Sequence, residues 1–435
     1  MSTPTLTPAQ APAPTAAAAA APGGVDVAGL LARRVPGHPL ESPFYTDPAV
    51  FDLDVSGVLA RTWLFVATEA EIREPGDYVT VDVGTYSVIV VRDDDEVVRA
   101  LHNVCRHRGA RVLDERAGSV GTIVCGYHRW TYATDGSLLH AGDQPPTFDK
   151  GCFGLKQVHV RVLAGLVFVC LADEPPPDFD EVVATVSPYL LPHQLHRTKV
   201  AAQVDLVEAA NWKLVMENNR ECYHCEGGHP ELIRTFFPTY GYTEDQIPKR
   251  LQPAHQRYLA AEADLEQACE QRGLAYAAVE ELRDRVSGFR VQREALDGAG
   301  ESYTLDGRAA CRRLLGDLDS PRLGRATVHT QPNAWLHVLA DHAVTFSALP
   351  LSVDRTLVRT TWLVHEDAVE GTDYDVEALT HVWRETNEQD SVFCAKAQRG
   401  VSSPAYEPGP YAVSERQVDD FTSWYVDRLG EHLAR

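Results

Sequence analysis

Cys105-Arg106-His107 and Cys125-Gly126-Tyr127-His128 decide the fold of the first half of the chain. Each segment offers one sulfur and one nitrogen ligand, and seventeen residues separate His107 from Cys125. Zinc sites usually group their ligands as C-x2–4-C and H-x3–5-H, so zinc is the weaker interpretation. A [2Fe–2S] cluster with two Cys on one iron and two His on the other suits two such loops. The spacing therefore predicts that Cys105, His107, Cys125 and His128 hold a cluster of this kind.

Short β-branched runs surround these loops and alternate with turn residues rather than with helices, which favours a small sandwich or barrel. The runs lie at residues 78–83, 86–91, 97–104, 121–124, 158–162 and 166–171. Asp173-Glu174-Pro175-Pro176-Pro177 ends this stretch, so we predict an all-β Rieske [2Fe–2S] domain over residues 63–177. Imidazole ligands raise the potential of such a cluster to about −150 mV or above, against about −400 mV for an all-Cys plant-type cluster.

The composition is that of a globular protein long enough for more than one domain. The 435 residues are 44% hydrophobic and 23% charged. A formal net charge of −22 argues against nucleic-acid or anionic-membrane partners, since both require a basic face. No apolar run is long enough for a transmembrane helix. Nine unevenly spaced cysteines do not form a disulfide scaffold, so we expect a reducing, cytoplasmic location with any special Cys serving a metal.

The N-terminal region divides into a tail and a helical segment. Residues 1–24 are mostly Pro and Ala and lack the features of a signal or transit peptide. We therefore predict a disordered tail over residues 1–38. The apolar pattern of residues 48–63 predicts a short helix, and we assign residues 39–62 to the catalytic domain.

The remaining residues, 178–435, combine helices with strands. Strand-like runs lie at residues 200–207, 334–339, 343–349 and 356–364, and helical patterns at residues 210–225, 374–399 and 418–433. Residues 250–290 are rich in Ala, Glu, Leu, Gln and Arg and predict two charged helices broken near Gly273. The fold class is therefore α+β, with a small all-β domain followed by a catalytic domain in which helices back an antiparallel sheet.

A second group of metal-binding residue types lies near the start of the catalytic domain. Glu221 and His224 are three residues apart and share one helical face, and His229 follows a pair of glycines. Two His and one distant carboxylate form a facial triad that leaves positions open for O2 on a mononuclear Fe(II). Asp390, on a polar part of an otherwise apolar helix, is the candidate third ligand.

Some residues in and around this group have two interpretations. Cys222 and Cys225 have the spacing of a redox or zinc pair, but inside a helix we interpret them as small buried side chains. Trp335 and Tyr303 are candidates for lining a substrate pocket, although an aromatic residue in a sheet usually belongs to the core.

With both groups of candidate metal ligands, the chain resembles the Rieske non-haem iron oxygenases, the α subunits of the ring-hydroxylating type. The resemblance covers about residues 40–430 and implies a helix-grip catalytic domain. The family's E/D-x-x-H-x4-H segment implies that His224 and His229 are iron ligands, and its C-terminal helix implies the same for Asp390. Glu221 matches the carboxylate that bridges cluster and iron, where ring dioxygenases usually have Asp.

Glu at this position is found in the branch that oxidises quaternary ammonium compounds. The segments NNRECYHC at 218–225, SYTLDG at 302–307, TTWLVHEDAVEG at 360–371 and SPAYEPGP at 403–410 are similar to the glycine betaine and stachydrine N-demethylating monooxygenases. The resemblance implies oxidation of an N-methyl group with release of formaldehyde. An aromatic-ring dioxygenase is the enzymatic alternative, and a Rieske electron carrier is the alternative without catalysis.

The resemblance also implies partners. In that family a separate flavin and iron–sulfur reductase delivers electrons from NAD(P)H, and no flavin or nicotinamide motif is visible in this chain. The family forms head-to-tail homotrimers in which the cluster of one subunit faces the iron of the next, and such a heterologous ring closes with threefold symmetry. The substrate is expected to be a small betaine held by aromatic faces, with a basic or polar group at its carboxylate end.

Overall fold

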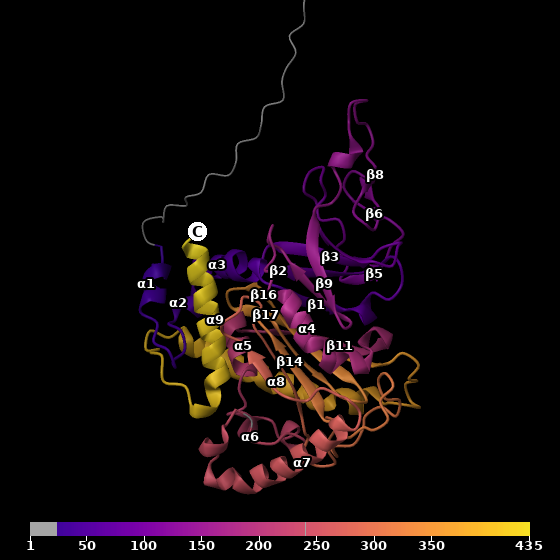
Figure 1. Cartoon of the computed structure of the whole chain (residues 1–435). Coiled ribbons are helices and arrows are strands. Elements are labelled where there is room, and N and C mark those ends of the chain that lie inside the picture. Colours follow the sequence, from indigo (N-terminus) through magenta and orange to yellow (C-terminus); the bar gives the residue numbers. More distant parts are fainter. Residues whose placement is uncertain (1–23, 240) are drawn as a thin grey trace, which may run out of the picture.

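The structure of the chain, a computed structural model, describes residues 24–239 and 241–435. Two seven-stranded sheets dominate it (Figure 1). The sheet made of the earlier strands lies in the upper part of Figure 1 with a small three-stranded sheet, and the later sheet lies below among the longer helices. The predicted α+β fold is therefore confirmed.

The first sheet is antiparallel, with the strand order β1-β10-β9-β4-β3-β2-β5. Its β-branched runs bury Val81, Ile89 and Leu101 almost completely, and this burial holds the sheet together. The strands are β1 (Leu64–Thr68), β2 (Asp77–Val83), β3 (Tyr86–Arg92), β4 (Val98–His102), β5 (Ala117–Ser119), β9 (Gln157–Leu163) and β10 (Leu166–Cys170).

The small sheet projects away from the rest of the molecule at the top of Figure 1. It consists of β6 (Ile123–Val124), β7 (Thr131–Tyr132) and β8 (Leu138–His140). An aromatic cluster supports it, since the Trp130 ring makes edge contacts with Phe148 and Phe153 at centroid distances of 5.7 and 6.0 Å. The segment with Cys125 joins β6 to β7, and the segment with Cys105, which follows β4 of the first sheet, contacts Tyr132 of β7.

The second sheet is also antiparallel, with the order β11-β17-β16-β15-β14-β13-β12. Its strands are β11 (Thr198–Glu208), β12 (Val279–Glu281), β13 (Phe289–Glu294), β14 (Arg325–Thr330), β15 (Ala334–Val338), β16 (Ala343–Ser352) and β17 (Arg355–His365). The helices of this part are α4 (Phe179–Leu190), α5 (Trp212–Asn219), α6 (Cys225–Gly228), α7 (Gln252–Glu270), α8 (Val376–Val401) and α9 (Arg416–Leu433). Helix α8 packs on β11 and on α5, so it carries residue 390 to the segment after α5.

Two predicted helices differ from the structure. The helix predicted over residues 210–225 ends at Asn219, because the chain turns there and only a short helix, α6, follows. The second charged helix predicted after Gly273 is wrong, since β12 and β13 occupy that stretch. Residues of β13 are buried throughout, so sheet pairing outweighs their helical propensity.

Part of the predicted tail is also folded. Residues 1–23 lie outside the described residues, but helix α1 (Val27–Ala32) begins soon after them, with the Asp26 side chain accepting a hydrogen bond from the Gly29 amide at its N-terminus. Val27 and Leu30 are buried, and α1 packs against α9. The prediction of disorder for residues 24–38 is therefore wrong, because their apolar side chains have a partner late in the chain.

The segment that precedes the first sheet packs on the second part of the molecule. It contains α2 (Pro43–Thr46), α3 (Pro48–Leu53) and a π-helical turn at Asp54–Val58. The buried Asp54 carboxylate accepts hydrogen bonds from the Trp212 indole at 3.0 Å and the Tyr425 hydroxyl at 2.6 Å and pairs with Lys213. Three segments far apart in the sequence therefore share one buried polar cluster.

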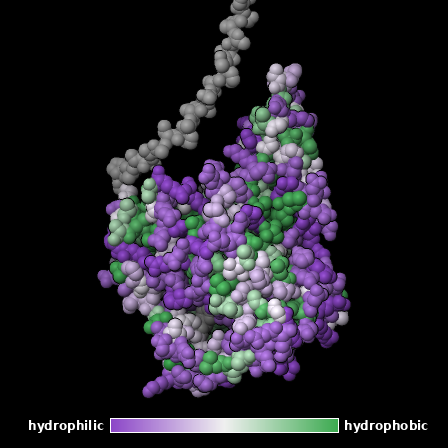
Figure 2. Space-filling view, viewed as in Figure 1, coloured by the Kyte–Doolittle hydropathy of each residue, from purple (hydrophilic) through white to green (hydrophobic). Residues whose placement is uncertain are grey.

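The visible surface is mainly hydrophilic, with hydrophobic residues gathered beside β3 and β9 (Figure 2). Val162, on β9, is 38% exposed. Within the described part of the chain, no helix is long and apolar enough to cross a membrane.

Candidate metal centres

The two predicted cluster loops have the same backbone fold. In each loop the amide four residues after the Cys donates to the Cys carbonyl at 3.0 Å, and the Cys amide donates to the carbonyl five residues later, at 2.8 and 2.9 Å. Gly109 and Arg129 take equivalent positions with φ of +76° and +60°, a conformation that glycine adopts more easily than arginine. The loops therefore present their ligands in equivalent ways.

The four predicted ligands divide by burial. Cys105 and Cys125 are 3% and 1% exposed, whereas His107 and His128 lie at the surface. The two imidazole rings approach with centroids 4.5 Å apart. Two buried cysteines with two exposed histidines fit a [2Fe–2S] cluster, which these four side chains would hold through two Cys and two His ligands.

Two residues beside the loops support the ligands. The Tyr132 hydroxyl lies 3.2 Å from the Cys105 sulfur and accepts a hydrogen bond from the Arg106 amide at 3.1 Å. Burial, together with the contact to Cys105, raises the pKa of Tyr132, so the hydroxyl keeps its proton. Trp130 stacks on the His107 ring at 5.0 Å and fixes its orientation. Neither Tyr132 nor Trp130 was predicted. The only signal in the sequence was that both follow closely after Cys125 and His128.

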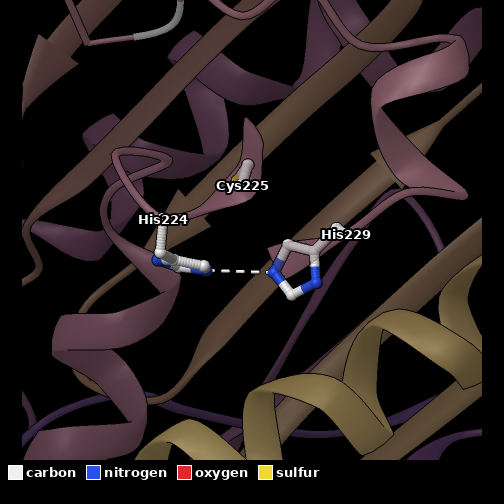
Figure 3. Close-up of side chains that lie close together, drawn as sticks. All are labelled: His224, Cys225 and His229. Carbon is white, nitrogen blue, oxygen red and sulfur yellow. Dashed lines mark hydrogen bonds between the residues drawn. The ribbon is translucent and has the colours of Figure 1, made fainter. Parts of the chain in front are cut away.

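The second candidate centre joins α5, α6 and α8. His224 and His229 turn their rings toward each other, and their Nε2 atoms are 3.0 Å apart (Figure 3). The Asp390 Oδ1 atom lies 3.3 Å from His224 Nε2 and 3.1 Å from His229 Nε2. The structure thus brings the three predicted iron ligands to one point, and two nitrogens with one carboxylate suit a mononuclear non-haem iron.

Hydrogen bonds to the far nitrogens fix both imidazoles. Glu221 Oε1 lies 2.6 Å from His224 Nδ1, and Gln389 Oε1 lies 2.8 Å from His229 Nδ1. Both acceptors place the proton on Nδ1, which leaves each Nε2 lone pair free for a metal. Glu221 therefore reaches the centre through His224, the position expected of a bridging residue.

Gln389 and Asn218 complete the surroundings. Gln389 donates from its amide nitrogen to Glu231 at 2.9 Å, which fixes which end of the amide faces His229. Asn218 donates to Asp390 Oδ1 at 2.8 Å. Neither residue was predicted, although Gln389 adjoins Asp390 and Asn218 lies one turn before Cys222 in the sequence.

Charges at the centre favour a bound cation. Burial opposes ionisation of Asp390, but hydrogen bonds with His224 and His229 hold the pKa of its carboxyl below the usual range. Burial likewise opposes protonation of His224, yet hydrogen bonds and the charges of Asp390 and Glu221 raise its pKa to about 10. A divalent metal would replace that proton and satisfy both carboxylates.

Cys222 and Cys225 differ from the prediction. The helix ends before them, their Cα atoms are 4.9 Å apart, and their sulfurs form a disulfide, so they are not simply small core residues. The Cys225 sulfur lies within 4.8 Å of ring nitrogens of both His224 and His229, but Figure 3 shows its side chain set back from the facing rings. A disulfide sulfur carries no thiolate charge, so Asp390 is the better third ligand.

A cavity opens at this centre. Its volume is about 60 Å³, and residues from α5, α8 and β14 line it together with the predicted iron ligands. The lining includes Phe236, Arg325, His329, His337 and Trp383.

The two residues predicted to line a substrate pocket, Trp335 and Tyr303, do not line this cavity. Trp335 stacks on Phe346 within the sheet at 5.0 Å and is absent from the cavity lining. Tyr303 is fully buried and contacts the Trp383 ring at 5.1 Å, which places it behind the lining. Residues that do line the cavity, such as Trp383, were not predicted, because they come from segments that are far apart in the sequence and share no motif.

Two family models match the chain. The model for the ring hydroxylating alpha subunit (catalytic domain) matches residues 195–431, and the model for the Rieske [2Fe-2S] domain matches residues 62–158. The chain belongs to the Rieske ring-hydroxylating oxygenase family. A Rieske oxygenase combines a [2Fe–2S] domain with a catalytic non-haem iron domain, and it uses O2 with electrons from a separate reductase. The similarity expected from the sequence is thereby confirmed, and a simple electron carrier is excluded.

Relatives of this Rieske oxygenase match over most of its length. The chain is 44% identical to the glycine betaine monooxygenase oxygenase subunit of Chromohalobacter salexigens, over 93% of the chain and 89% of that protein. It is 40% identical to the glycine betaine monooxygenase oxygenase subunit of Pseudomonas aeruginosa strain UCBPP-PA14, over 93% of the chain and 92% of that protein.

Solved structures support the fold. The crystal structure of the quaternary ammonium Rieske monooxygenase CntA with substrate L-carnitine superposes with a TM-score of 0.64 and 20% identity, over 92% of this chain and 97% of that one. Naphthalene 1,2-dioxygenase with indole bound in the active site gives a TM-score of 0.63 and 22% identity, over 90% and 92% of the two chains. At these identities the superpositions establish the fold of this Rieske oxygenase and nothing finer.

Proposed function

We propose that the chain oxidises an N-methyl group of a small quaternary ammonium carboxylate, with glycine betaine as the first candidate. The observation that carries this proposal is the 44% identity, along 93% of the chain, to a glycine betaine monooxygenase oxygenase subunit. The match to the carnitine monooxygenase oxygenase subunit of Escherichia coli K12 is 34% over 43% of the chain. A betaine without a long side chain is therefore the better candidate.

The proposed site assigns each predicted residue a role. Cys105, His107, Cys125 and His128 hold the cluster, in a domain over residues 63–177. His224, His229 and Asp390 hold the iron, in a domain over residues 178–435 that residues 39–62 complete. The facing nitrogens and the carboxylate oxygen, 3.0 to 3.3 Å from one another, support the iron assignment, and the paired loops support that of the cluster.

The metal centre, when loaded and reduced, supplies the chemistry that inserts an oxygen atom from O2 into a C–H bond. The balanced reaction for glycine betaine is betaine plus O2, NADH and H⁺, giving dimethylglycine, formaldehyde, water and NAD⁺. The hydroxylated methyl group leaves as formaldehyde, and the nitrogen keeps the electron pair of the broken C–N bond. The chain's own residues hold the substrate and restrict access of water to the small cavity.

Electron delivery is proposed to cross between subunits of a head-to-tail homotrimer. In Figure 1 the small sheet, whose β6–β7 connection contains Cys125, and helix α6 lie at opposite ends of the molecule. Such separation within one chain supports transfer to a neighbouring subunit, with Glu221 as the bridge to His224. The hydrophobic residues beside β3 and β9 in Figure 2 give this part of the surface the character of a contact area. A separate flavin and iron–sulfur reductase would supply electrons from NAD(P)H.

The test is a substrate panel. Purified protein, O2, NADH and a surrogate reductase would be given glycine betaine, stachydrine, carnitine, choline and toluene, and formaldehyde and ring hydroxylation would be measured. We expect the highest kcat/KM for formaldehyde release with glycine betaine or stachydrine. Hydroxylated toluene without formaldehyde from any betaine would instead favour an aromatic-ring dioxygenase. That alternative has weaker support, since the large component of the 2,4-dinitrotoluene dioxygenase system is 35% identical over only 44% of the chain.

A further inference from the structure

We propose that Arg325 binds the carboxylate of the substrate and so selects betaines over quaternary ammonium compounds that lack an anion. This inference rests on the proposed function and specifies how the cavity recognises its ligand. Arg325 begins β14, on the sheet that forms the floor of the cavity, whereas the predicted iron ligands belong to the α5–α6 segment and to α8.

The guanidinium of Arg325 is buried but incompletely paired. It is 3% exposed, and its Nε and Nη2 atoms donate to Glu294 Oε2 at 3.3 and 3.0 Å. Its Nη1 atom is buried and has no hydrogen-bond partner among the described residues. A buried donor without a partner costs free energy unless a ligand or a water satisfies it. Arg325 thus offers an Nη1 donor group without a described partner within the lining of the cavity.

Trp383 on α8 adds a second donor of the same kind. Trp383 is 7% exposed, and its buried Nε1 atom has no hydrogen-bond partner among the described residues. Both Trp383 and Arg325 line the cavity that holds the predicted iron ligands. Two unpaired N–H groups in the lining of one cavity, one of them cationic, are complementary to a carboxylate.

Of the described residues that line the cavity, Arg325 is the sole Lys or Arg. His329 and His337 are buried, and burial together with nearby Arg side chains holds the pKa of each well below its usual range. These two imidazoles are therefore neutral, so the positive charge of this wall belongs to Arg325.

The position of Arg325 also orients a zwitterion. Arg325 and Phe236 line both this cavity and an adjoining one, while His224 and Asp390 line the first cavity only. Arg325 therefore lies at the boundary of the two cavities. Asp390 and Glu221 together balance the charge of a divalent metal, so the metal end does not repel an ammonium group. A betaine with its carboxylate at Arg325 would thus direct an N-methyl group toward the predicted ligands.

Arg325→Gln is the primary test, with affinity measured by calorimetry on the metal-loaded protein. Loss of a charge-assisted hydrogen bond should weaken glycine betaine binding about 10- to 100-fold, while choline affinity should change by less than about 3-fold. Arg290→Gln is the matched control, because Arg290 is also a buried arginine paired with a carboxylate, Glu280 at 3.1 Å, yet lines only the adjoining cavity. It should leave betaine affinity within about 2-fold.

Two further variants separate recognition from folding. Arg325→Gln leaves Glu294 buried without this partner, so the double variant Arg325→Gln/Glu294→Gln removes both charges and should show the same loss of betaine affinity. Trp383→Phe keeps an aromatic ring, removes the N–H and disturbs no ion pair. It should weaken the binding of glycine betaine about 5-fold. Unchanged cluster absorption and iron content would show that each variant is folded.

The outcomes distinguish this inference from the proposed function. Equal loss of betaine and choline affinity in Arg325→Gln, or no loss of either, would overturn the role of Arg325 even if wild-type protein demethylates betaine. Betaine binding that depends on Arg325 without formaldehyde release would leave the anion site standing and overturn the proposed function. Failure of wild-type protein to bind any betaine would overturn both.

Discussion

In the cluster loops, Cys105 and His107 are two positions apart in the sequence, and amides of the same loop fix them. Asn218 and the Asp390 carboxylate that it contacts are 172 positions apart. The first centre is built from local loop geometry that is repeated once. The second depends on helix α8 packing against α5. A local motif therefore needs little beyond its own turns, while the triad requires the fold of the whole catalytic part to be correct.

This contrast predicts that the two centres can be lost independently. Asp390→Ala removes the carboxylate between His224 and His229, so we expect loss of mononuclear iron and a fall in turnover of roughly 100-fold or more. Cluster absorption should persist, because its ligands lie in another sheet. Iron per chain, visible absorption and formaldehyde release are the measurements. Glu388→Ala, an exposed neighbour on the same helix, is the control, and loss of both metal signals in Asp390→Ala would contradict independence.

The reciprocal change is Cys105→Ala. It removes a sulfur ligand of the cluster, so visible absorption and reductase-dependent turnover should both disappear, while iron at the other centre should remain. Cys152→Ala removes an exposed free cysteine and should leave the spectrum unchanged. Survival of the cluster absorption in Cys105→Ala would show that the cluster assignment is wrong.

Glu221 is where the two centres are expected to communicate. Glu221→Gln keeps the size of the side chain but removes its charge, and we expect both metals to remain. Re-oxidation of the reduced cluster by substrate and O2 should slow about 10- to 100-fold, because the hydrogen-bonded link through His224 is altered. Rapid-mixing absorbance measures this step. The variant Glu221→Asp retains a carboxylate, so its rate of cluster re-oxidation should lie between the rates of the wild type and of Glu221→Gln. Loss of mononuclear iron would make Glu221 a ligand rather than a bridge.

Gln389 tests how far the triad depends on its surroundings. Gln389→Leu removes the acceptor that places the His229 proton on Nδ1, so affinity for iron should fall about 10- to 100-fold. Gln389→Glu keeps an acceptor at that position and should retain most of the affinity. Competition with a chelator gives both values. Equal affinities in the two variants would mean that packing alone orients His229.

The sequence predicted the features that are local or periodic. The paired C-x-H and C-x-x-H segments, the β-branched runs and helix α8 are of this kind, and the Glu221–His224–His229 spacing predicted two of the three candidate iron ligands. Arg325 and Trp383 could not be found in this way, because they meet only when β14 and α8 approach the same cavity. The helix predicted after Gly273 failed for a related reason, since pairing of β13 with β14 is a long-range effect that propensity does not contain.

The smallest predicted effect returns to the cluster and concerns its potential rather than its presence. With Cys105 bound as a thiolate, the Tyr132 hydroxyl 3.2 Å away must donate the hydrogen bond, since the sulfur has no proton. Such a bond stabilises the more negative, reduced cluster more than the oxidised one. Tyr132→Phe should therefore lower the reduction potential, by an amount on the order of tens of millivolts, without loss of cluster.

Spectroscopic redox titration would measure this shift. Tyr127→Phe is the matched control, because Tyr127 belongs to the second loop and is 59% exposed. Its ring lies tilted against that of the adjacent His128, with centroids 3.8 Å apart. Its potential should stay near that of the wild type. A Tyr132→Phe potential that is unchanged or higher would mean that the hydroxyl does not donate to the ligand sulfur. In that case burial of the two cysteines, rather than a hydrogen bond, would dominate the tuning of the cluster.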